Sequence, residues 1–155
     1  MTIQETYSLI IEAEISSQKL YKALAKSFSN PETSDLFKEL VLLEENHETR
    51  IRAAFSTEFP GEELPTMENP PWEMKAIKLD DPADVLAYAI SREELAQSTY
   101  ISLAHQTETP EIQALLLQFA EEETQHKNLL LAETQRLHGA MQWFDPSELN
   151  GLMED

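Results

Sequence analysis

Apolar residues recur with a helical period along most of the chain, and the exception is a proline-rich stretch near its middle. That stretch runs from Pro60 to Pro71, holds four prolines and Gly61, and shows no helical period. We therefore expect one pair of helices at about 3–28 and 31–55, a crossing segment at about 56–81, and a second pair within about 82–138.

The expected helix starts carry capping signals. Thr2-Ile3-Gln4-Glu5 has the spacing of a capping box, in which the threonine and the glutamate satisfy each other's backbone amides. Proline loses no hydrogen bond at the first helical position, and an acid beside it faces the positive end of the helix dipole. This combination follows a cap residue at Asn30-Pro31-Glu32, Asp81-Pro82-Ala83-Asp84 and Thr109-Pro110-Glu111. Gly139 is expected to end the last helix.

Short loops within each pair and one long connection between the pairs predict an all-α fold. It is an up-down four-helix bundle with one long crossover, the connectivity of ferritin-like bundles. The 155 residues have the length of one domain, and only three glycines occur, which fits long helices. In the tail, 139–155, Asp145-Pro146 predicts a short further helix that carries Leu149, Leu152 and Met153.

The net charge of −18 argues against nucleic acid and anionic membranes as partners, because both attract basic surfaces. Cations are the natural counter-charge. The chain has no cysteine, which excludes disulfides, thiolate metal sites and iron–sulfur clusters. No stretch approaches the ~20 apolar residues that a membrane-spanning helix requires, so we expect a soluble, cytoplasmic protein.

The two halves of the chain resemble each other, without gaps, at an offset of 79 residues. Many matching pairs are turn or core residues, which indicate only a shared fold. The polar pairs are harder to explain by packing, and they are Glu14 with Glu93, Tyr21 with Tyr100, Glu44 with Glu123, and His47 with His126. In each half the glutamate and the histidine of the last two pairs form a Glu-x-x-His sequence, and their side chains share one helix face. That sequence alone arises readily by chance in so acidic a chain, and the repeat gives it weight.

Glu14 lies sixteen residues before Asn30 and Glu44 fourteen after it, so an antiparallel hairpin brings the two level to within about a turn. The turn at residue 109 does the same for the second half. Di-iron and di-manganese bundles use this inward-facing set, with Glu from two helices and Glu-x-x-His from the other two. We therefore expect two divalent metal ions to be held by Glu14, Glu44, His47, Glu93, Glu123 and His126.

Four carboxylates balance two divalent ions in charge, as a buried site requires. Without metal the carboxylates repel one another, so we expect retained protons and reduced stability. An oxygen-rich set with two imidazoles suits iron, which we favour, or manganese, and it also accepts zinc.

Each of these residues also has a plainer interpretation. A single Glu or His in an acidic helical chain is more often solvated than a metal ligand. Tyr21 and Tyr100 lie two helical turns after Glu14 and Glu93, where a phenol can donate to a ligand carboxylate of the facing hairpin, or simply pack in the core.

Other acidic and histidine residues are not expected to be ligands. His105 and His138 lack a glutamate three positions earlier. The glutamates beside the predicted ligands are expected to face solvent, and they are Glu45, Glu94, Glu121 and Glu122.

At the repeated residues the chain resembles the rubrerythrin-like branch of the ferritin superfamily. The matching motifs are Glu14…Tyr21, Glu44-x-x-His47, Glu93…Tyr100 and Glu123-x-x-His126, and the likeness covers about residues 3–138. The resemblance implies a di-iron carboxylate bundle, commonly a homodimer, whose members reduce hydrogen peroxide or oxidise ferrous iron with oxygen or peroxide.

The sequence departs from this family in two ways. Typical rubrerythrins carry a rubredoxin domain with four cysteines, and this chain has none, so turnover would need an external electron donor. Peroxidase members also carry an extra glutamate three positions after the helix-3 ligand, where this chain has Ala96, with Ser17 at the repeat position. The symmetric site is then closer to a ferritin-type ferroxidase centre. An oxidoreductase, a metal-binding or sensing module without turnover, and a helical interaction protein all stay open as functions.

Overall fold

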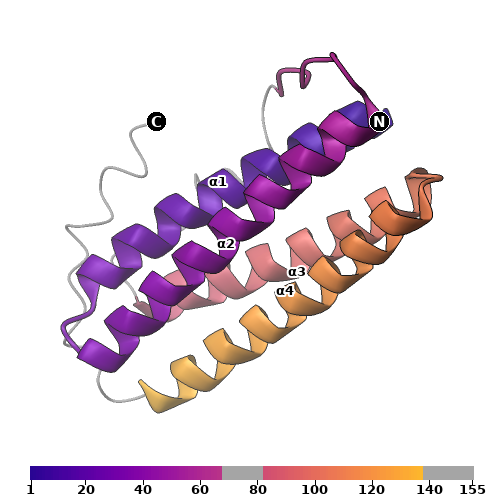
Figure 1. Ribbon diagram of the computed structural model, residues 1–155. Coiled ribbons are helices and arrows are strands. Elements are labelled where there is room, and N and C mark those ends of the chain that lie inside the picture. The colour runs from indigo at the N-terminus through magenta and orange to yellow at the C-terminus, as the bar shows by residue number, and fades with distance from the viewer. Residues whose placement is uncertain (68–81, 138–155) are drawn as a thin grey trace.

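Four helices make up most of the part of the chain that the computed structural model describes, residues 1–67 and 82–137 (Figure 1). No strand occurs within these two ranges. The helices are α1 (Ile3–Ser27), α2 (Pro31–Glu58), α3 (Pro82–Gln106) and α4 (Pro110–Arg136). The prediction of an all-α four-helix bundle is confirmed.

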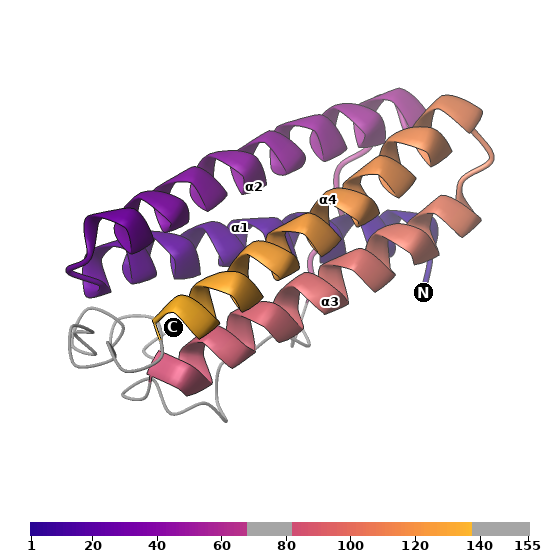
Figure 2. The same cartoon turned by 90° about the horizontal axis from the view of Figure 1, so that it is seen from below.

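The helices form two antiparallel hairpins, α1 with α2 and α3 with α4 (Figures 1 and 2). Contacts are most extensive within each hairpin, fewer between α1 and α3, and fewer still between α2 and α4. In Figure 1 the colours show that α1 and α3 run in opposite directions. The connectivity is that of a ferritin-like bundle.

The starts of α1, α2 and α4 follow the predicted caps, with one difference, whereas Asp81, the predicted cap of α3, lies outside the described residues. The Glu5 amide donates to Thr2 Oγ1 at 3.1 Å, and the Thr2 amide donates to Glu5 Oε1 at 3.0 Å, which completes the capping box. Asn30 Oδ1 accepts from the Glu32 amide at 2.9 Å. Thr109 occupies the predicted cap position of α4, but its side chain makes no capping hydrogen bond.

The ends of the helices differ slightly from expectation. α1 ends one residue early, whereas α2 continues to Glu58, three residues beyond the expected end. No glycine or proline occurs in α2 after Pro31, so nothing interrupts the helix before Phe59, whose amide still bonds to Phe55 at 2.8 Å. Residues 59–67 are not helical, and Gly61 adopts the positive φ of 78° that a turn there requires. Gly139 and the helix expected in the tail lie outside the described residues.

The core consists of two apolar clusters at different heights of the bundle. One includes Tyr7, Ile51, Leu103 and Leu116, and the other includes Leu24, Phe37, Leu86 and Leu130. In every helix, the predicted metal ligands lie between the residues of the two clusters. The bundle therefore holds one polar layer between two apolar layers.

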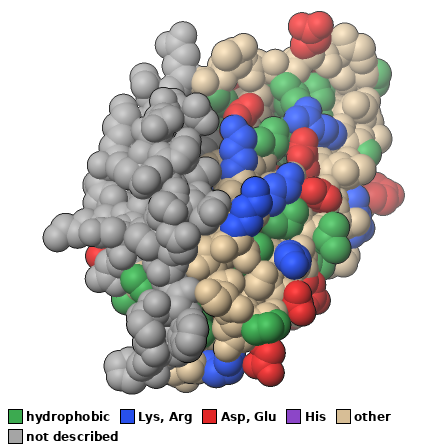
Figure 3. Space-filling view, turned by 90° about the vertical axis from the view of Figure 1, so that its left-hand side faces the viewer, with side chains coloured by type: hydrophobic (Ala, Val, Ile, Leu, Met, Phe, Trp, Pro, Cys, Tyr) green, Lys and Arg blue, Asp and Glu red, His purple; other side chains and the backbone are tan. Residues whose placement is uncertain are grey.

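The face of the molecule shown in Figure 3 is mixed in charge. Acidic and basic side chains intermingle on the face shown in Figure 3, and no histidine is visible among the described side chains there. Of the described helices, none combines the length and apolar character needed to cross a membrane.

Candidate metal centre

All six predicted ligands lie inside the bundle, in the polar layer between the two apolar clusters. Their exposed fractions are 1% for Glu14, Glu44, His47 and Glu123, 2% for Glu93 and 3% for His126. Burial of four carboxylates is costly unless positive charge accompanies them. The fold therefore concentrates acidic groups where water cannot solvate them.

The six side chains form two overlapping groups. The first is Glu14, Glu44, His47 and Glu123, and the second is Glu44, Glu93, Glu123 and His126. Within each group, one potential ligand atom of every residue lies within 4.8 Å of those of the others. The groups share Glu44 and Glu123, and each group adds one imidazole and one further carboxylate.

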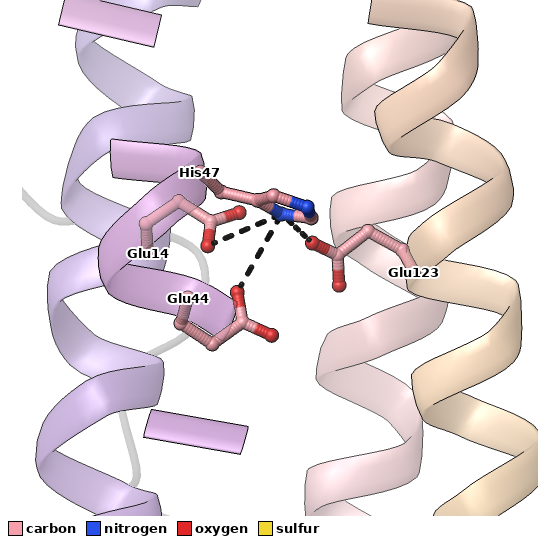
Figure 4. A group of neighbouring side chains, drawn as sticks. All are labelled: Glu14, Glu44, His47 and Glu123. Carbon is pink, nitrogen blue, oxygen red and sulfur yellow. Dashed lines mark hydrogen bonds and ion pairs between the residues drawn. The ribbon is translucent and has the colours of Figure 1, made fainter. Parts of the chain in front are cut away.

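Each group draws on both hairpins. His47 Nδ1 on α2 lies 2.7 Å from Glu123 Oε1 on α4, and 3.8 Å from Glu14 Oε2 on α1 (Figure 4). In the opposite sense, His126 Nδ1 on α4 lies 3.0 Å from Glu44 Oε1 on α2. Both imidazoles therefore turn Nδ1 toward the carboxylates, and the sequence repeat appears as a crosswise symmetry between the hairpins.

The two predicted tyrosines also reach across the hairpins. Tyr100 Oη donates to Glu14 Oε1 at 2.8 Å, and Tyr21 Oη donates to Glu93 Oε1. Both phenols are fully buried, and burial followed by the nearby carboxylate charges raises the pKa of each well above its ordinary value. They therefore stay protonated and can donate to the carboxylates.

The oxygen atoms of the centre are left with too few protein partners. Glu14 Oε2, Glu93 Oε2 and Glu123 Oε2 are buried and accept no hydrogen bond from the described residues. Burial, followed by repulsion from the other carboxylates, raises the pKa of Glu44 and of Glu123 well above the usual range. Unpaired buried oxygens in a site with excess negative charge fit divalent cations, which would satisfy both.

Without metal, protons take up part of this charge. Burial disfavours the charged form of His126, but its hydrogen bond to Glu44, its contact with Glu93 and the charges of both carboxylates raise its pKa to about 10. For Glu93, burial alone would raise the pKa, yet interactions with Glu123, His126 and Tyr21 lower it. An ion that binds here has to displace the proton of His126.

The structure also shows what occupies the two positions three residues after Glu14 and Glu93. Ser17 Oγ accepts a hydrogen bond from Arg92 Nη2 at 3.2 Å. Ala96 lines a small cavity of about 10 Å³ beside Glu14 and Tyr100, which is at most the space of one water. Neither position offers a fifth carboxylate.

Glu122 does not behave as the sequence predicted. Its side chain is only 27% exposed, and its Oε1 lies 3.5 Å from His47 Nε2, the ring nitrogen turned away from the carboxylates. The expectation that it faces solvent is wrong. By contrast, Glu94 is 54% exposed beside Lys127 and Glu45 is 46% exposed beside Lys22, and Glu121 is exposed, as expected.

Arg92 was not singled out from the sequence, yet it is only 5% exposed. Its guanidinium on α3 donates to the Ala13 carbonyl on α1 at 2.9 Å and to Ser16 Oγ at 2.9 Å. Its repeat partner is Ala13 itself, so the repeat carried no signal for it. These hydrogen bonds connect α3 to α1 directly beside Glu93 and Glu14, the predicted ligands of the two helices.

Comparison with known proteins agrees with the fold. The chain is similar over 90% of its length to "Hypothetical Protein Pfu-1136390-001 From Pyrococcus furiosus", 92% of which it covers, with 26% identity and a TM-score of 0.79. The name of that protein states no activity. No protein of curated function matches the chain. Residues 8–78 and 84–150 each match the family described as Rubrerythrin, and the chain therefore belongs to the rubrerythrin family.

Proposed function

We propose that the protein binds two divalent ions, iron in its working form, and is an oxidoreductase that reacts Fe(II) with peroxide or oxygen. The observation that carries this proposal is the buried set of four carboxylates and two imidazoles, arranged as two groups that share Glu44 and Glu123. Membership of the rubrerythrin family supports the same assignment.

The six residues would bind the two ions in the following arrangement. Glu44 and Glu123, which belong to both groups, would serve both ions, Glu14 and His47 would complete one position, and Glu93 and His126 would complete the other. When bound, two Fe(II) ions would together supply two electrons within the same site. The surrounding chain keeps bulk water out, because two apolar clusters enclose the polar layer from both ends.

The two tyrosines hold the terminal carboxylates and keep their own protons. Tyr100 and Tyr21 each fix one oxygen of Glu14 and Glu93, which leaves the other oxygen free to face an ion. With peroxide, the overall reaction oxidises two Fe(II) to Fe(III), consumes two protons and releases two waters. Return to Fe(II) requires two electrons from an external donor, because the chain carries no cysteine cluster of its own.

The direct test is anaerobic loading with two Fe(II) per chain, followed by one equivalent of hydrogen peroxide. We expect the absorbance of ferric iron in the near ultraviolet to increase after peroxide is added. The matched control is Glu44→Gln, which removes a ligand common to both groups and should abolish stoichiometric loading. No spectral change in the fully loaded wild-type protein would contradict the redox proposal.

A second candidate function is metal binding or sensing without turnover. The absence of a carboxylate at Ala96 favours it, because only a cavity of about 10 Å³ stands where peroxidase members of the family carry an additional ligand. This candidate predicts tight binding of two ions and large thermal stabilisation, but little consumption of peroxide. Rapid multiple turnover with a generic reductant would eliminate it.

A further inference from the structure

The outward-facing nitrogens of the two site histidines have different surroundings, although the ligands themselves follow the repeat. His47 Nε2 has Glu122 Oε1 at 3.5 Å. The repeat pairs Glu122 with Leu43, so Leu43 is the residue that corresponds to Glu122 for His126. A leucine side chain cannot accept a hydrogen bond. No partner of His126 Nε2 occurs among the hydrogen bonds of the described residues.

The same asymmetry extends to the ring faces. His47 stacks on Phe119, with ring centroids 4.3 Å apart and planes inclined by 27°, and the guanidinium of Arg50 covers the Phe119 ring at 4.8 Å. The repeat replaces Phe119 by Leu40 and Arg50 by Leu129. Glu122 and Phe119 contact His47, and Arg50 contacts Phe119. The repeat pairs each of these three residues with a leucine.

Glu122 has an arrangement suited to a partner of His47. It is partly withdrawn from water, with 27% of its side chain exposed, and its Oε2 is buried with no hydrogen-bond partner in the described part of the chain. An imidazole that binds metal through Nδ1 presents an N–H at Nε2, and a carboxylate that accepts this proton fixes the tautomer and orients the ring. It also makes the other nitrogen a better ligand.

We propose that Glu122 is a positioning residue that orients His47 and makes the two ion positions inequivalent, so that the position served by Glu14 and His47 binds its ion more tightly. This inference rests on the proposed function, because it needs two ions at the six-ligand site. It assigns the difference between them to one residue outside the ligand set. Carboxylate partners of ligating histidines typically change metal affinity by about 10- to 100-fold.

The repeat supplies matched variants for the test. Glu122→Leu gives His47 the residue that His126 has, and Leu43→Glu gives His126 the residue that His47 has. Glu121→Gln is the control for charge, since Glu121 is the exposed neighbour on the same helix. Thermal melts of the metal-free variants establish that each one folds.

The measurement is calorimetric titration of the metal-free full-length chain with Mn(II), which avoids oxidation. Wild type should show two binding constants about 10- to 100-fold apart, and Glu122→Leu should weaken only the tighter one until the two converge. Leu43→Glu should tighten the weaker one, and Glu121→Gln should change neither. Two equal constants in the wild type, or wild-type constants in Glu122→Leu, would overturn the inference while leaving the proposed function intact. A wild type that takes up no Mn(II) and no Fe(II) would overturn both.

Discussion

Glu93 and Glu94 are neighbours on α3 and differ entirely in environment, which makes them a sharp test of the ligand assignment. Glu93 is 2% exposed and belongs to one of the two ligand groups. Glu94 has a side chain that is 54% exposed, 3.4 Å from Lys127. Adjacent helical residues point about 100° apart, so only one of the two can face the centre.

The size of the expected effect follows from the geometry. The ligand atoms of each group lie within 4.8 Å of one another, and at that separation two unit charges interact with about 3.5 kcal/mol at an effective dielectric constant of ~20. Replacing Glu93 by Gln leaves one positive charge of a filled site without a carboxylate to balance it, which we take as the loss of one interaction of this size. Glu93→Gln should therefore weaken the combined binding of the two ions by roughly 300-fold.

Glu94→Gln should leave metal binding unchanged, because it removes only an exposed ion pair worth at most about 1 kcal/mol of stability. By the repeat, Glu14→Gln should behave like Glu93→Gln, and Glu45→Gln like Glu94→Gln. Anaerobic calorimetric titration with Fe(II) compares all four variants. Loss of binding in Glu94→Gln but not in Glu93→Gln would refute the assignment of the ligands on α3.

The metal-free protein should lose stability as the pH rises. The pKa values of Glu44 and Glu123 are raised above 4.5 and that of His126 is raised from 6.5 to about 10, so the folded state holds more protons than the unfolded state across this range. The share due to His126 is complete below about pH 6.5 and disappears toward pH 10, and a thermal midpoint that rises from pH 6 to 9 would contradict this. Adding metal should raise the midpoint, by the equivalent of about 2.7 kcal/mol at a free ion concentration 100 times the dissociation constant; a midpoint insensitive to chelator would argue against a structural role of the ions. Tyr100→Phe removes the donor to Glu14 and should weaken binding by about 10- to 100-fold in a competition titration, whereas unchanged affinity would mean that the phenol only packs.

The fold was largely predictable because its signals are local. The capping box at Thr2 and Glu5 and the Asn30 cap each depend on residues three or fewer positions apart, and the structure contains both. The six buried residues at the centre were found by a different signal, the offset of 79 residues, which converts a long-range arrangement into a comparison of two segments.

The residues that the sequence did not reveal are those that break the repeat. Glu122 matches Leu43 and Arg92 matches Ala13, so symmetry argued for neither. Their environments depend on the packing of one hairpin against the other: Glu122 on α4 approaches α2, and Arg92 on α3 bonds to α1. Periodicity within a single helix gives the face of a residue, but not which side chain of a distant helix lies opposite.

The crosswise arrangement of the centre also bears on how fast an ion could leave it. Each position takes its donors from both hairpins, and the apolar clusters enclose it at both ends. We therefore expect an ion to leave only when the hairpins move apart, and the rate of metal exchange to be set by that opening motion of the protein. A stronger chelator would not accelerate the loss, whereas heating would, steeply, as it does for unfolding. The same bundle would then retain its ions for kinetic as well as thermodynamic reasons.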